Sequence, residues 1–284
     1  MPRSAFTEIA DGVYVARYPQ WDVNVGLVVG TAGALVIDTR SSAAAGAEVL
    51  RDVGRVADPS AVRHVVNTHV HFDHTFGNIA FAGCTIHAHD NVATALDAHA
   101  AWIKRAASAD PGDAPEYGYT AADIADLLAT PVRKPDATFT TSAVVDLGDR
   151  VALLRYAGRG HTDGDAAVLV PDSGVAFLGD LIEQPGPPSF GPDSWPLEWA
   201  DTLEEHLTIL AADVVLVPGH GTAVDRDYGD RQRAQIALVA SVIRERRTAG
   251  MTLDEARQEP DARLPYPVGL LQDAFARGWQ QPGV

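Results

Sequence analysis

The segment from His69 to His74 places three imidazoles and one carboxylate within six residues, in the pattern H-x-H-x-D-H. A purely structural role rarely requires so many metal-binding side chains in so short a segment. A polar loop with coincidental histidines is therefore the weaker explanation. His69 and His71 are two residues apart, and an extended backbone points both side chains to one side. His74 breaks that spacing and can turn toward a second ion. We therefore interpret this segment as part of a metal site.

Three further segments repeat one local arrangement, in which an apolar strand leads into glycine and a side chain that can bind a metal. They are GHTDGD at 160–165, GD at 179–180 and PGHG at 218–221. Glycine-rich loops at strand ends are where α/β proteins usually place ligands. His161, Asp180 and His220 would each be ordinary structural or turn residues if they stood alone. Their recurrence in the same setting favours one shared site.

The spacing of apolar residues predicts strands followed by a helix, twice over. The predicted strands cover residues 12–18, 25–29, 34–37, 64–67, 84–88, 143–145, 151–156, 166–170, 175–178 and 214–217. The predicted helices cover residues 43–53 (capped by Ser41 or Ser42), 91–107, 121–128, 201–211, 226–248 and 253–257, with a short one starting near Thr75. This order suggests two mixed β layers with helices outside, a four-layer α/β arrangement.

Composition limits the classes of partner. The net charge of −16 repels phosphodiester backbones, so we expect no nucleic-acid partner. No stretch approaches the roughly 20 apolar residues of a membrane helix, and Met1–Asp11 lacks the apolar segment of a secretory signal. Cys84 is the only cysteine, which excludes an internal disulfide and fits a reducing cytoplasm. We expect a cytoplasmic protein that acts on a small molecule, with no membrane partner; the oligomeric state stays open.

Taken in order, the H-x-H-x-D-H, G-H-T-x-G-D, G-D and P-G-H-G segments resemble the metallo-β-lactamase superfamily. The resemblance covers roughly residues 8–225, including the ALVIDT stretch that leads to Asp38. It implies a four-layer αββα sandwich with its site along one edge of the two sheets. We expect a single domain over residues 1–284, with a core at about 8–225 and C-terminal helices at 226–284.

Carried over motif by motif, the resemblance implies two metal ions. The first would be held by His69, His71 and His161, the second by Asp73, His74 and His220, and Asp180 would bridge them. Mixed imidazole and carboxylate ligands suit two Zn²⁺ ions and also admit Mn²⁺ or Fe. Asp38, Thr68 and Asp165 are candidates for fixing the ligands in place, with backbone capping as an equal alternative for each.

Two cations roughly 3.5–4 Å apart lower the pKa of a bridging water enough to give hydroxide near neutral pH. The same ions polarise a substrate carbonyl and stabilise the developing oxyanion. Asp73 is also a candidate catalytic residue, because it can orient the hydroxide or pass a proton to the leaving group. We therefore expect a binuclear metal-dependent hydrolase that cleaves an ester, thioester, lactone or lactam bond of a small molecule.

The types of candidate ligand indicate which groups of enzymes within the superfamily this sequence resembles most. Many of its β-lactamases carry cysteine where Asp180 stands, and another lactamase group lacks an acid there, so the pattern is closer to glyoxalase II and the lactonases. Glu183 stands where some acyl-homoserine lactonases have tyrosine, which argues against that group. The alternative is an iron-dependent oxygenase or redox enzyme of the same fold, similar to the persulfide dioxygenases. The complete second set of Asp73, His74 and His220 favours two metals instead.

Three segments are expected to shape the substrate site, namely residues 18–21, 102–119 and 184–199. Packing of their aromatic side chains against the sandwich is an equal alternative. The other five histidines are expected to lie on surfaces or fill packing roles; they are His64, His87, His89, His99 and His206.

Overall fold

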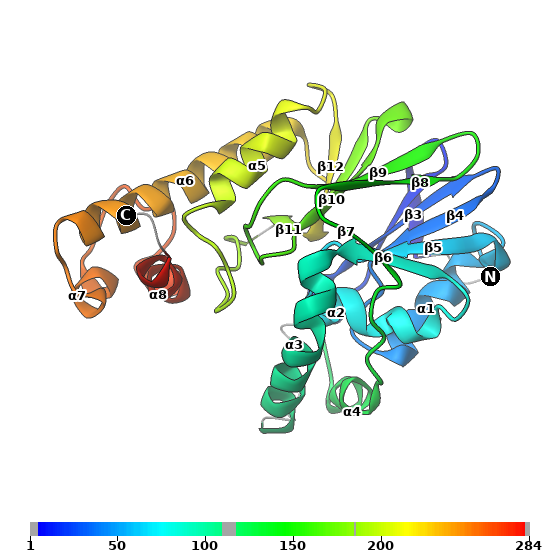
Figure 1. Cartoon of the computed structure of the whole chain (residues 1–284), viewed down its shortest axis with the longest axis horizontal. Helices are drawn as coiled ribbons and strands as arrows, with labels where there is room; N and C mark the ends of the chain where they lie inside the picture. The colour runs from blue at the N-terminus through cyan, green and yellow to red at the C-terminus, as the bar shows by residue number, and fades with distance from the viewer. Residues whose placement is uncertain (1–4, 110–117, 185, 282–284) are drawn as a thin grey trace.

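The computed structural model describes residues 5–109, 118–184 and 186–281. Two β-sheets face each other, and helices cover the outer surface of each sheet (Figure 1). The predicted four-layer α/β arrangement is therefore confirmed.

The first sheet has seven strands in the order β1-β2-β3-β4-β5-β6-β7. Their bounds are Phe6–Ala10, Val13–Arg17, Asn24–Gly30, Gly33–Ile37, Val62–Val66, Thr85–His89 and Ala137–Phe139. Neighbouring strands from β1 to β4 pair antiparallel, and those from β4 to β7 pair parallel. Parallel pairing needs crossover connections, so the chain after β5 must travel from one end of the sheet to the other before β6 begins. The first candidate motif lies in that connection.

The second sheet has five strands in the order β12-β11-β10-β9-β8. In chain order, β8 to β12 span Ser142–Asp146, Val151–Tyr156, Ala166–Val170, Val175–Glu183 and Val215–His220. Only the β11–β12 pair is parallel. Because β11 and β12 run in the same direction, Asp180 and His220 are delivered toward the same edge of this sheet.

Eight α-helices flank the sheets within the described residues. They are α1 Ala43–Val53, α2 Phe72–Thr75, α3 Asp90–Ala109, α4 Ala121–Ala129, α5 Trp199–Thr208, α6 Arg226–Thr248, α7 Leu253–Gln258 and α8 Gln272–Gln280. Helices α1 to α4 lie on the side of the seven-stranded sheet, and α5 and α6 lie on the side of the five-stranded sheet (Figure 1). None of the described helices combines the length and apolarity needed to cross a membrane.

Local sequence explains why these helices form where they do. The Ser42 side chain accepts a hydrogen bond from the Ala45 backbone and caps α1, as one of the two predicted alternatives stated. Val49 and Val53 of that helix are buried against the seven-stranded sheet. On the other side, α5 and α6 bury apolar side chains in one cluster with β10 and β11.

Three differences from the expected elements bear on the site. Strand β11 continues to Glu183 because it keeps pairing with β12, so Asp180 lies within the strand rather than in the glycine-containing loop that was expected to follow residue 178. Helix α2 begins at Phe72, inside the first motif, and not near Thr75. Strands β1 and β7 and helix α8 were not predicted.

The core between the two sheets depends on Phe177, which is 3% exposed. Its ring occupies the space above Gly26 of β3, where an added Cβ would lie 2.4 Å from Phe177 Cε1. Leu35, Ile37 and Val168 belong to the same buried cluster. A large side chain on one sheet therefore fills the space that a glycine leaves on the other.

Replacing Phe177 by alanine should lower the free energy of unfolding by about 3–5 kcal/mol, because the mutation leaves a cavity between the sheets. Denaturant unfolding of the two proteins measures this difference. A loss below about 1 kcal/mol would mean that the sheets do not depend on this contact.

Candidate metal centre

The structure brings all seven predicted ligand residues together at one edge of the two sheets. The potential ligand atoms of His69, His71, His161 and Asp180 all lie within 4.8 Å of one another, and so do those of Asp73, His74 and His220. The residues arrive from the chain after β5, the loop after β9, the middle of β11 and the end of β12. Segments more than a hundred residues apart in sequence therefore contribute donor atoms to one cluster.

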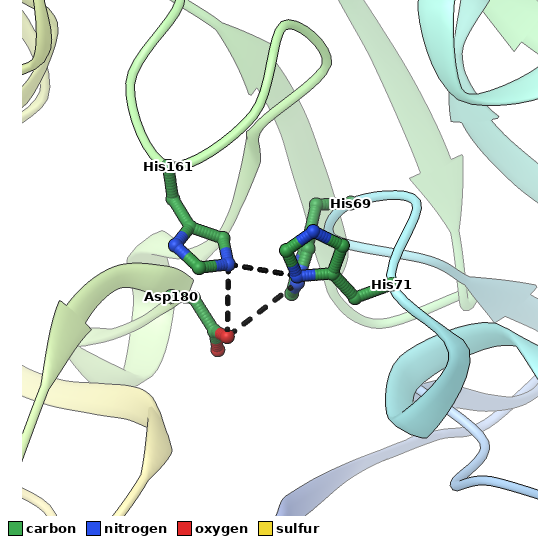
Figure 2. A group of neighbouring side chains, drawn as sticks. All are labelled: His69, His71, His161 and Asp180. Atoms are coloured by element: carbon green, nitrogen blue, oxygen red, sulfur yellow. Dashed lines mark hydrogen bonds and ion pairs between the residues drawn. The ribbon is translucent and has the colours of Figure 1, made fainter. Parts of the chain in front are cut away.

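Figure 2 shows the first group, in which three imidazoles and one carboxylate point toward a common centre. His161 Nε2 lies 2.9 Å from His71 Nδ1 and 3.3 Å from Asp180 Oδ2. His69 Nε2 lies 3.5 Å from the same carboxylate oxygen. Ring nitrogens of separate histidines approach this closely when they share a proton or a cation.

The second group meets the first at Asp180. His74 Nε2 lies 3.4 Å from Asp180 Oδ1 and 3.6 Å from Asp73 Oδ2. His220 Nε2 lies 3.2 Å from Asp180 Oδ2 and 3.5 Å from Asp73 Oδ2. The Asp180 carboxylate therefore faces donor atoms of both groups.

In each of the five histidines, one ring nitrogen points into the donor cluster and the other lies within hydrogen-bond distance of an oxygen atom outside it. These pairs are His69 Nδ1 with Thr68 Oγ1 (3.0 Å), His71 Nε2 with Asp193 Oδ2 (3.0 Å), His74 Nδ1 with Asp38 Oδ2 (2.8 Å), His161 Nδ1 with the Ser189 carbonyl (3.1 Å) and His220 Nδ1 with the Trp21 carbonyl (2.8 Å). Such partners fix the ring orientation and the tautomer of a metal-binding histidine. The arrangement leaves the inward nitrogen of each ring available.

Asp38 and Thr68 take the first of the two roles that the sequence left open for them, since both contact rings of candidate ligands. Asp38 Oδ1 accepts a hydrogen bond from the Thr68 backbone at 2.8 Å, and Asp38 Oδ2 accepts one from Thr68 Oγ1 at 2.8 Å in addition to facing His74. Asp38 holds a backbone φ of +63°, a conformation that residues other than glycine adopt at a cost. The contacts to Thr68 and His74 offset that cost.

Asp165 has the alternative role, which is capping. Its carboxylate accepts hydrogen bonds from the backbone N–H of Thr162, at 2.9 Å to Oδ2, and from Thr162 Oγ1 at 2.7 Å to Oδ1. Burial raises the pKa of this carboxyl to about 7. Asp165 thus closes the loop that carries His161 without contacting a ligand ring itself.

The donor set fits a cation. His69 Nε2, His74 Nε2 and Asp180 Oδ1 are buried and have no hydrogen-bond partner among the described residues. Unsatisfied polar atoms at such positions cost free energy unless a missing partner contacts them. A bound cation would satisfy all three atoms together.

Burial and neighbouring carboxylates shift the pKa values of the histidines in opposite directions. Burial lowers the pKa of His69 well below its ordinary value and that of His161 to about 4. Burial also acts to lower the pKa of His74, but the carboxylates of Asp180, Asp73 and Asp38 outweigh it and raise that pKa to about 9. His69 and His161 are therefore neutral at neutral pH, whereas His74 must lose a proton to bind a metal. Against the same effect of burial, nearby carboxylates also raise the pKa of His71 and of His220, with Asp193 the main carboxylate at His71 and Asp180 at His220.

Sequence reasoning missed Asp193 and Ser189, which hold two ligands of the first group. Both lie in the segment after β11 that was expected to shape the site, but neither was singled out. Ser189 acts through its carbonyl, so its residue type gives no signal. His99 was also missed, because it was expected to fill a packing role. It stacks on His71 with ring centroids 5.0 Å apart, and it forms a third donor group with His71 and Asp193.

The four remaining histidines have packing partners away from the candidate ligands. His64 Nδ1 lies 3.1 Å from His87 Nε2, and His89 stacks on Tyr156 with ring centroids 3.8 Å apart. His206 is buried beside Arg155. Their expected packing roles agree with these contacts.

Comparison with known proteins identifies the family to which this fold and this site belong. The model of the metallo-beta-lactamase superfamily matches residues 18–227. The acyl-coenzyme A thioesterase MBLAC2 of Bos taurus is 24% identical over 229 residues, which is 76% of this chain and 80% of that protein.

Solved structures give the same result for the fold. The metallo-beta-lactamase FIM-1 from Pseudomonas aeruginosa, in its mono-zinc form, superposes with a TM-score of 0.60 at 20% identity, over 83% of this chain and 95% of that one. The stereoselective inverting sec-alkylsulfatase Pisa1 from Pseudomonas sp. superposes with a TM-score of 0.73 at 15% identity, over 96% of this chain and 50% of that one. Since the family model spans well over half of the sequence, the chain belongs to the metallo-β-lactamase superfamily of metal-dependent hydrolases.

Proposed function

We propose that this protein is a binuclear hydrolase that cleaves a thioester, or a related ester, lactone or lactam bond, in a small molecule. One observation carries the proposal: the buried Asp180 carboxylate lies between two groups of nitrogen and oxygen donors. The thioester is placed first because a curated relative, MBLAC2, is named as an acyl-coenzyme A thioesterase.

In this proposal His69, His71 and His161 hold one ion, Asp73, His74 and His220 hold the other, and Asp180 contacts both. When bound, two such cations supply an activated water and polarise the substrate carbonyl. The mixed donors suit Zn²⁺, and Mn²⁺ or Fe fit the same set.

Residues of the chain transfer protons during the reaction and orient the metal ligands. Asp73 Oδ2 faces the inward nitrogens of His74 and His220. In this proposal the same carboxylate also passes a proton to the leaving group. Asp38 holds His74 in the tautomer that presents Nε2. We also propose that residues 1–284 act as one domain, because α6 and α8 bury apolar residues in the same cluster as β11.

The function is tested with purified protein loaded with zinc, manganese or iron and assayed on thioesters, esters, lactones, lactams and phosphodiesters. We expect hydrolysis of a thioester, and we expect Asp180→Asn and His74→Ala to lower kcat by more than about 100-fold, since loss of a direct ligand exceeds the 10–100-fold cost typical of supporting residues. His64→Ala, which is remote from the site, serves as the control. Oxygen consumption by the iron-loaded protein without any hydrolysis would contradict the proposal and favour an oxygenase.

Asp193→Asn should weaken binding of one metal ion by about 10–100-fold, because the variant loses the carboxylate that orients His71. Calorimetric titration of the metal-free protein with zinc measures both affinities. Asp213→Asn, an exposed acid on the surface, is the matched control for the loss of one charge. Equal affinities in the Asp193 variant and the parent protein would show that Asp193 does not support the centre.

Metal uptake should release protons at pH 7, because His74, whose pKa is about 9 in the metal-free protein, and His220, whose pKa nearby carboxylates raise well above the ordinary value, must give up their protons to bind. The apparent metal affinity should therefore rise with pH by about tenfold per pH unit for each displaced proton. Calorimetry in buffers of different ionisation enthalpy counts the protons. Uptake at pH 7 with no proton release would show that both imidazoles are already neutral.

A further inference from the structure

Helix α3 and the segment after β11 enclose a pocket of about 400 Å³ next to the candidate metal centre. Helix α3 contributes Ala95, Ala98, His99 and Trp102, which are spaced i, i+3, i+4 and i+7 and therefore share one face of the helix. The volume falls within the range of pockets that hold small molecules. The two alanines provide the space, because a larger side chain at either position would fill it.

The pocket adjoins the candidate ligands through three of its lining residues. Val70 stands between His69 and His71 in the chain, and Asp193 accepts a hydrogen bond from the His71 ring. His99 stacks on the same ring. The pocket therefore adjoins the candidate metal centre at the His71 ring.

The opposite wall is a rigid aromatic surface. Trp195 lies under the guanidinium of Arg159, 3.6 Å from the ring centroid, and Arg277 of α8 lies 5.2 Å from the same ring. Arg277 is itself fixed by a hydrogen bond to the Ser194 carbonyl at 2.9 Å. Two guanidinium groups against one indole restrict its rotation, and both Trp195 and Arg277 line the pocket.

Trp102 forms a second aromatic wall and is 46% exposed, which is unusual for so large an apolar side chain. Among the polar lining residues, the Asp193 carboxylate faces His71, and Arg277 donates hydrogen bonds to the Ser194 carbonyl and to Gln280 Oε1. Asp163 also lines the pocket. Two indoles around a space lined by alanine and proline favour a flat apolar occupant, because aromatic rings gain from stacking beyond the burial of area.

We propose that this pocket binds the non-reacting part of the substrate and that this part carries an aromatic ring. The inference rests on the proposed hydrolase function for its biological meaning. Binding to the pocket itself is a separate property, because it requires neither metal nor turnover.

The binding test uses metal-free protein and three neutral probes: phenylacetamide, cyclohexylacetamide and acetamide. Tryptophan fluorescence and two-dimensional NMR follow each titration. Saturable binding is expected for phenylacetamide, at least about fivefold weaker binding for cyclohexylacetamide, and none for acetamide. Ala98→Leu should weaken phenylacetamide binding by at least about tenfold, because the leucine side chain fills the pocket.

Ala101→Leu, an exposed alanine of the same helix outside the pocket lining, is the matched control and should leave binding unchanged. Trp102→Ala is a second variant, which removes one wall without filling the space. If either variant is less stable, its folded fraction is measured by denaturant unfolding before the titration. Phenylacetamide binding that neither pocket variant weakens would overturn the proposal, and so would equal affinity for the cyclohexyl probe.

With metal-loaded protein, the ratio of kcat/KM for a phenylacetyl thioester over an acetyl thioester should fall by about tenfold in Ala98→Leu. Thioester hydrolysis with no saturable phenylacetamide binding would overturn the pocket assignment and leave the proposed function intact. Probe binding with no hydrolysis of any substrate would support the pocket and count against the proposed function.

Discussion

The buried carboxylate of Asp180 is the contact on which the rest of the site depends. It is 3% exposed, and the inward nitrogens of His69, His74, His161 and His220 lie 3.2–3.5 Å from its oxygens. A carboxylate this deep is tolerated only when positive charge or hydrogen bonds compensate for the lost water. Burial acts to raise its pKa, but the surrounding histidines outweigh that and hold it well below the ordinary value. Gly219 permits this position, because a Cβ there would lie 1.7 Å from Asp180 Oδ1.

The pairing of the strands in the two sheets brings the residues around Asp180 together. Parallel pairing of β11 with β12 brings Asp180 and His220 to one edge, and the crossover after β5 brings the first motif to meet them. The segment after β11 then has two functions, since it supplies oxygens to His71 and His161 and also walls the neighbouring pocket. The proposed substrate pocket and the orientation of the candidate ligands therefore involve the same stretch of chain.

The sequence predicted the layers and the seven candidate ligands because both leave local signals. Strands and helices alternate with clear apolar periods, and the ligands are donor types in short motifs beside glycine. Asp193 and Ser189 leave no such signal, since their roles depend on the path of an irregular segment. Helix α8 was missed because the residues it buries include Ala274 and Gly278, which give little apolar contrast. Strand β7 spans only Ala137–Phe139, too few residues for an alternating pattern.

Anomalous diffraction from crystals of the zinc-loaded protein tests the central claim most directly. We expect two zinc peaks, one among His69, His71 and His161 and one among Asp73, His74 and His220, with Asp180 in contact with both. A single peak at the first group, or none at this edge of the sheets, would contradict the paired centre from which the proposed chemistry follows.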